Sequence, residues 1–190
     1  MLLATLLLAA VAVAIPTFDG LSTQHNFISN VVPRSTPITA MGDAMRGKGH
    51  HLCSHNFDEP GNLTIIQTLH KAPPIFSLSP ADQQLWQYQN ESTVYPITVL
   101  NTTGPSDDRP FLQLLVGKQP RSTNVISGGA WKWSGSSLRY WLGPKSNSGI
   151  YYSCPTGGSR LGLFTSLVPG PNPPGCNLVT LHGFSENIQR

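Results

Sequence analysis

Hydrophobic and polar residues alternate in short runs along most of the chain after residue 50. The runs are rich in Val, Ile, Leu, Thr and aromatic residues, and Gly, Pro, Asn or Asp separates them at short intervals, as in strands joined by tight turns. We expect strands at 63–69, 74–78, 85–89, 94–100, 111–116, 124–133, 138–142, 150–154, 161–168 and 177–184. No helical stripe of apolar residues competes with this pattern. About ten short strands predict an all-β fold, a single-domain antiparallel β-barrel or β-sandwich, because either architecture removes exposed sheet edges.

The clearest local pattern is the segment 131–141, which reads as a β-hairpin. A turn centred on Gly135-Ser136 would place Lys132 opposite Arg139. Because side chains alternate across a strand, we expect one face of the hairpin to line the core. That face carries Trp131, Trp133, Leu138 and Tyr140. The other face carries Lys132, Arg139 and Trp141, which we predict to be a solvent-exposed platform for a sugar or an anionic ligand.

The N-terminus resembles a secretory leader. Residues 2–14 are almost entirely apolar, too short to cross a bilayer, which takes roughly 20 residues. Ala12-Val13-Ala14 provides a small-x-small cleavage pattern. We expect a signal peptide at 1–14, an extended arm at 15–50 and a β-rich domain at 51–190. A buried N-terminal strand or helix is the alternative for the first segment, and a pro-segment is the alternative for the arm.

Composition supports an extracellular location. Charged residues are only 11% of the chain, against about 25% in ordinary soluble proteins, and three sequons could supply solubility through glycans. They are Asn62-Leu63-Thr64, Asn90-Glu91-Ser92 and Asn101-Thr102-Thr103. The net charge of +3 is small and its basic residues are scattered, so we expect neither a nucleic-acid partner nor a membrane partner.

The three cysteines allow one intramolecular bridge and leave one thiol over. We favour Cys154–Cys176, with Cys53 as the free thiol, because both late cysteines lie at edges of predicted strands in the same third of the chain. In a plain meander these two cysteines would lie at opposite ends of the middle strand. They meet only if the stiff, proline-rich stretch 169–175 carries the chain back along that strand.

No constellation of residues indicates catalysis, a metal site or a cofactor. The nine acidic residues all fall in predicted turns, arms or loops rather than on strands. A glycosidase needs two carboxylates on opposite sides of the scissile bond, so this placement lowers the odds of such an enzyme without excluding it. The ligand-dense run His50-His51-Leu52-Cys53-Ser54-His55 matches no zinc spacing and reads as a loop. His182 reads as a core residue of the last strand.

One lectin-like motif is present. Gln84-Leu85-Trp86 matches the Gln-x-Trp of ricin-type lectin trefoils. That family repeats the motif in each lobe, and we find no second copy, so a β-trefoil is less favoured than another barrel or a sandwich.

Three segments of the C-terminal part carry a family resemblance: Gly129-Ala130-Trp131-Lys132-Trp133, Gly149-Ile150-Tyr151-Tyr152-Ser153-Cys154 and the run from Pro174 to His182. From roughly Thr64 to Phe184 the chain resembles small secreted proteins of wood- and litter-inhabiting, basidiomycete-type fungi that have no assigned activity. The resemblance implies an extracellular β-rich domain with the two late cysteines paired, and it carries over no catalytic residue.

Together these features predict a secreted binding or interaction protein. Its ligand would be a carbohydrate, a small apolar molecule or another extracellular protein, and it would need no cofactor. The alternative is a small secreted hydrolase that acts on a plant or fungal polymer.

Overall fold

The computed structural model describes residues 35–43, 45, 49–56, 59–67, 72–90, 93–103, 109–117, 124–157 and 160–184. Within these ranges the chain is all-β and antiparallel, and none of them forms a helix that could span a membrane. The strands are β1 Ser35–Met41, β2 His50–Ser54, β3 Gly61–Gln67, β4 Ile75–Leu78, β5 Leu85–Asn90, β6 Thr93–Asn101, β7 Phe111–Val116, β8 Gly129–Ser134, β9 Ser137–Leu142, β10 Lys145–Ser146, β11 Ile150–Pro155, β12 Leu161–Ser166 and β13 Asn177–Gly183.

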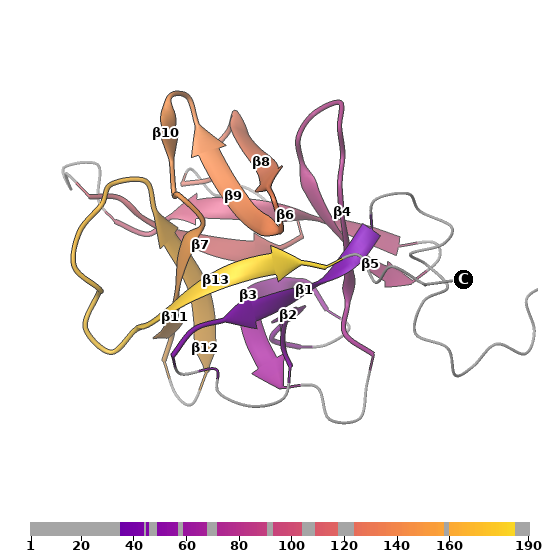
Figure 1. Cartoon of the computed structure of the whole chain (residues 1–190), viewed down its shortest axis with the longest axis horizontal. Coiled ribbons are helices and arrows are strands. Elements are labelled where there is room, and N and C mark those ends of the chain that lie inside the picture. The colour runs from indigo at the N-terminus through magenta and orange to yellow at the C-terminus, as the bar shows by residue number, and fades with distance from the viewer. Residues whose placement is uncertain are drawn as a thin grey trace, which may run out of the picture.

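Eight of these strands close into a β-barrel (Figure 1). Around the ring each strand pairs with the next, in the order β1, β4, β5, β6, β7, β12, β11, β13 and back to β1. The predicted barrel is therefore confirmed, and the sandwich alternative is not adopted. Closure leaves no free edge within the ring.

Two further hairpins attach to the ring. The β2–β3 hairpin joins β1 on one side and β7 on the other. The β8–β9 hairpin, extended by the short strand β10, meets the ring through a single registered pair, Ser137 opposite His182 of β13. In Figure 1 the β8–β9 hairpin lies above β13 and β6, at the top of the view.

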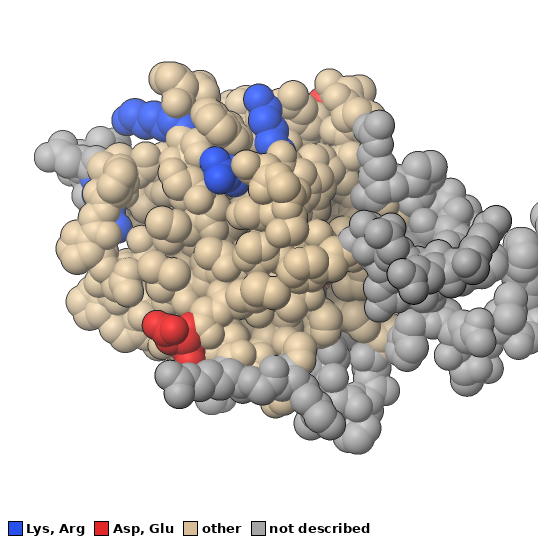
Figure 2. All heavy atoms as spheres, viewed as in Figure 1, with Lys and Arg blue, Asp and Glu red and all other residues tan. Residues whose placement is uncertain are grey.

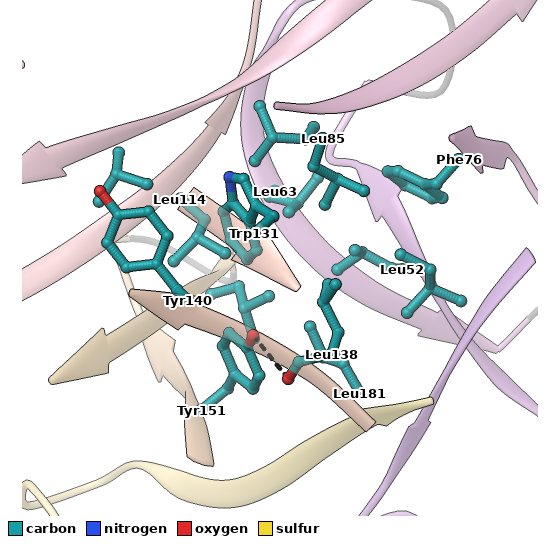
Figure 3. Close-up of a cluster of buried hydrophobic side chains, with 14 of the residues drawn as sticks. Leu52, Leu63, Phe76, Leu85, Leu114, Trp131, Leu138, Tyr140, Tyr151 and Leu181 are labelled. Atoms are coloured by element: carbon teal, nitrogen blue, oxygen red, sulfur yellow. Dashed lines mark hydrogen bonds between the residues drawn. The ribbon is translucent and has the colours of Figure 1, made fainter. Parts of the chain in front are cut away.

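The core fills the barrel with aliphatic side chains and with aromatic side chains from the β8–β9 hairpin (Figure 3). Trp131 is 1% exposed and its ring lies 4.9 Å from that of Tyr140. Tyr151 is also fully buried, and its hydroxyl donates a hydrogen bond to the Leu138 carbonyl at 3.0 Å. A buried tyrosine hydroxyl needs a hydrogen-bond partner, and this hydrogen bond joins the hairpin to β11.

The boundary predicted at residue 50 does not coincide with the edge of the sheet. Residues 35–41, expected to belong to an extended arm, form the barrel strand β1, and the histidine run expected to be a loop forms β2. β1 gains most of its pairing from the distant strands β13 and β4, so local sequence gives little sign of it. β2 pairs mainly with the adjacent strand β3. Residues 124–128, expected as strand, make only an isolated bridge between Val125 and Leu100. The predicted leader and the first part of the arm lie outside the described residues.

The predicted disulfide Cys154–Cys176 is present. Cys53 is buried and takes no part in a disulfide, and its thiol donates a hydrogen bond to the Ser54 carbonyl at 3.0 Å. The strands β11, β12 and β13 do not form a plain meander, because β11 lies between β12 and β13 and is antiparallel to both. The chain must therefore return along the barrel between β12 and β13. The proline-rich segment makes that return and brings Cys176 to Cys154, as the prediction required.

Candidate functional site

The β8–β9 hairpin has the register and the two faces expected from the sequence. Lys132 lies directly opposite Arg139, and the turn residue Gly135 has a φ of 60°, which suits a glycine-first two-residue hairpin turn. On the outward face Lys132 is exposed, while Arg139 and Trp141 are half-buried. The Lys132 ammonium lies 5.5 Å from the Trp141 ring centroid, within cation–π range. The three predicted ligand-binding residues are thus brought together, with the ammonium over the indole.

This outward face is basic. Figure 2 shows Lys and Arg side chains over the β8, β9 and β10 region, with little acidic surface around them. The acidic residues that the structure describes are Asp43, Glu59 and Asp82, all in turns or bends, and none of them forms an ion pair with Lys132 or Arg139.

A second place, on the side wall of the barrel, was not predicted as a site. Along β5 the side chains of Leu85 and Gln87 point inward, Gln87 being 1% exposed, so the intervening Trp86 and Tyr88 face outward. Ser77 of β4 lies opposite Trp86, and Val94 of β6 lies opposite Tyr88.

These outward side chains line an open groove of about 640 Å³. The lining carries no charged side chain and consists of Ser77, Leu78, Ser79, Pro80, Trp86, Tyr88 and Val94. Val94 remains 43% exposed. Two aromatic rings, aliphatic groups and the hydroxyls of two serines and a tyrosine therefore share one open surface.

On the opposite wall of the barrel, a second group of outward aromatic side chains is buried. There Phe111, Tyr152 and Phe164 form an outer cluster with the disulfide, and the rings of Phe111 and Phe164 stack at 4.8 Å. The proline-rich segment is fixed beside this cluster by the Cys154–Cys176 bridge and by a hydrogen bond of 2.8 Å from Arg109 Nη1 to the Pro171 carbonyl. Tyr152 and Phe164 are buried in this cluster, whereas Trp86 and Tyr88 line an open groove.

The Gln-x-Trp motif contributes its tryptophan to the groove, but its glutamine has a structural role. Gln84 Nε2 donates to the carbonyls of Ile97 at 2.7 Å and Leu85 at 3.1 Å, which fixes the start of β5 against β6. Period-2 alternation could have found Tyr88 as the outward neighbour of Trp86. It could not have shown that nothing in the described structure fills the space above them.

His182 is half-buried rather than enclosed in the core. Its Nδ1 lies 3.1 Å from Ser136 Oγ and its Nε2 lies 2.9 Å from Thr180 Oγ1, and burial lowers its pKa below the usual value. A serine next to a histidine suggests nucleophilic catalysis, but here the second ring nitrogen meets a hydroxyl and not a carboxylate. Nothing in this contact stabilises the imidazolium that a general base would form.

The histidine and cysteine run on β2 is divided between the two faces of its strand. Leu52 packs in the core, so alternation places His50 on the same side as Leu52 and turns His51 and Cys53 to the other side. Within the described residues no group of three or more His, Cys, Asp or Glu side chains could hold a metal ion.

Two of the three sequons have described side chains. Asn62 Oδ1 accepts a hydrogen bond of 3.0 Å from Gln113 Nε2 on β7. Asn101 Oδ1 accepts hydrogen bonds from Thr103 N at 3.1 Å and from Thr103 Oγ1 at 2.8 Å, within its own sequon. In both cases the oxygen is engaged, and none of these three hydrogen bonds uses the amide nitrogen to which a glycan would attach. The Asn90 side chain lies outside the described part of the structure.

Functional inference for this chain rests on the fold and on the sites described above. No family model matches the chain, and no curated protein or solved structure matches it either.

Proposed function

We propose that the protein is an extracellular carbohydrate-binding protein and that the groove beside Trp86 and Tyr88 binds a neutral sugar chain. The observation that carries this proposal is the outward pair of aromatic side chains in an open, uncharged groove. Its volume of about 640 Å³ falls within the range of roughly 300–1,000 Å³ typical of ligand sites.

The chemistry of the groove fits a sugar better than an apolar molecule. A pyranose ring presents C–H groups on its faces and hydroxyls around its rim, so it needs a flat apolar surface bordered by hydrogen-bonding groups. Trp86 and Tyr88 are two residues apart on one strand, which separates them by about 6.8 Å. Ser77, Ser79 and the Tyr88 hydroxyl supply polar groups within the same lining. A purely apolar ligand would cover the Ser77 and Tyr88 hydroxyls without offering them hydrogen-bond partners.

An extracellular location is supported by several features together. The disulfide is of a kind that persists in oxidising compartments, and the leader-like segment and the sequons suit passage through a secretory pathway. Expression in a secreting eukaryotic host tests this part. We expect released protein that begins at Ile15 and loses mass on endoglycosidase treatment, whereas an unmodified chain that begins at Met1 would contradict it.

Binding is tested by calorimetric titration with neutral oligosaccharides of different linkage. We expect at least one series to bind, and Trp86→Ala to weaken that binding about tenfold or more without lowering the melting temperature by more than a few degrees. Trp141→Ala, on the hairpin, is the matched control and should bind normally. Equal binding by wild type and Trp86→Ala would contradict the proposal, as would binding of an apolar dye at the groove with no response to any saccharide.

A further inference from the structure

The pairing of Lys132 with Arg139 concentrates positive charge on one patch of the hairpin. Directly opposed side chains in an antiparallel pair have Cβ atoms about 4.5–5.5 Å apart, and like charges at that distance destabilise the pair. No carboxylate in the described part of the chain pairs with either cation. The hairpin therefore holds two adjacent positive charges that the described residues do not neutralise.

Neighbouring groups restrict both cations. The Lys132 ammonium is held over the Trp141 ring at 5.5 Å, an attraction that limits the positions available to a flexible side chain. Arg139 is half-buried, and its Nε is inaccessible to water and has no acceptor. An anion at the end of the guanidinium would offset the cost of holding this charge partly out of water.

We propose that the outward face of the β8–β9 hairpin is a second binding site, which holds the carboxylate of a uronate-bearing carbohydrate between Lys132 and Arg139. The guanidinium offers paired N–H donors that match the two oxygens of a carboxylate, and the ammonium adds a point charge beside them. The Trp141 indole lies beside Lys132 in the same patch and can pack against the sugar ring that carries the carboxylate. Charge complementarity identifies the occupant as an anion.

This site is independent of the groove on the side wall. The groove lining contains no charged residue and comes from β4, β5, β6 and the loop after β4, whereas the basic pair lies on β8 and β9. The two sites can consequently be inactivated separately, and failure of one proposal does not imply failure of the other.

The experiment is a titration of the folded protein with uronate oligosaccharides, neutral oligosaccharides and sulfated oligosaccharides, at low and at physiological salt. The variants are Lys132→Gln and Arg139→Gln, with Lys145→Gln as the matched control because Lys145 is an exposed cation on the neighbouring strand β10. Arg139→Lys keeps the charge but removes the paired donors. Melting curves establish that each variant is folded.

We expect affinity for the uronate chain to fall about tenfold in Lys132→Gln and in Arg139→Gln, and to fall measurably in Arg139→Lys. Lys145→Gln and Trp86→Ala should bind the uronate chain like the wild type, and salt should weaken wild-type binding more than that of the two glutamine variants. Unchanged binding in Lys132→Gln and Arg139→Gln would overturn the site. An equal loss in Lys145→Gln would show a diffuse charge effect instead, and equal affinity for the sulfated chain would overturn the assignment to a carboxylate.

Discussion

The side chain of Asn147 accepts a hydrogen bond from the backbone N–H of Tyr140 through Oδ1, at 3.0 Å. The same oxygen accepts from Gly149 N at 3.0 Å, and Nδ2 donates to the Ile150 carbonyl and to Thr165 Oγ1. Asn147 is only 3% exposed. One buried amide thus joins the β8–β9–β10 unit, which carries the proposed uronate site, to the barrel strands β11 and β12.

We expect Asn147→Ala to lower the free energy of unfolding by about 3 kcal/mol, because it leaves the N–H groups of Tyr140 and Gly149 without their acceptor, at about 1–3 kcal/mol each. Urea denaturation measures the loss. Ser146→Ala is the control, since Ser146 Oγ makes only an exposed bond to Ser148 N, and it should cost less than about 1 kcal/mol. Similar losses in the two variants would show that the Asn147 network contributes no special stability.

Gly129 is fixed by the ring of Tyr140. A Cβ at position 129 would come within 2.6 Å of Tyr140 Cε2 and would contact the hydroxyl as well. Gly129→Ala should therefore cost about 1–3 kcal/mol, the usual cost of overpacking. The same substitution in a Tyr140→Leu background should cost much less, and a double-mutant cycle gives the coupling. Additive losses of stability in this cycle would show that residues 129 and 140 do not interact.

The two faces of the hairpin predict opposite responses to loss of an indole. Trp131→Ala empties a core position and should cost about 3–5 kcal/mol. Trp141→Ala removes a half-buried outward ring and should cost about 1 kcal/mol or less. Thermal melts compare the two variants, and greater loss in Trp141→Ala would mean that the faces are assigned the wrong way round.

Acidification should destabilise the fold through His51 and His182. Burial lowers the pKa of both imidazoles, with repulsion from His50 as a smaller cause at His51. Because their pKa values are higher in the unfolded chain, at about 6.5, the unfolded state binds more protons, and stability falls as the pH drops below about 6.5. Denaturant titrations between pH 5 and 8 should show this slope, and His182→Gln should reduce it. An unchanged slope in His182→Gln would mean that another group causes the pH dependence of stability.

Local information was enough to predict the register and the two faces of the β8–β9 hairpin, although the first strand was expected to begin at residue 124 and begins at Gly129. Its alternation is strict, and a glycine-containing two-residue turn fixes the register. The strand at 111–116 was also predicted with its observed bounds, because a run that is apolar except for Gln113 lies between turn residues. In these segments the pattern, the turn and the burial agree.

Sequence could not reveal β1 or the groove, because both depend on distant parts of the chain. β1 contains Pro37 and only two fully inward apolar residues, Ile38 and Ala40, and its pairing partner β13 lies more than a hundred residues away. The groove depends on coverage. Phe164 and Trp86 both point outward from the barrel, yet only Phe164 is buried, beside the proline-rich segment. Alternation reports which way a side chain points and not what lies over it.

The disulfide should act chiefly through the proline-rich return between β12 and β13. Cys154 and Cys176 are 22 residues apart, which corresponds to about 3 kcal/mol of loop-closure entropy. We expect dithiothreitol to lower the free energy of unfolding by about that amount in the wild type. The Cys154→Ala/Cys176→Ala variant should be equally destabilised and should not respond to the reductant, although it retains the buried Cys53. Cys53 is the only cysteine left in this variant, so a reductant effect that persists there would show that Cys53 forms a bridge to another molecule. A wild type insensitive to the reductant would mean that contacts such as that between Arg109 and Pro171 hold the segment instead.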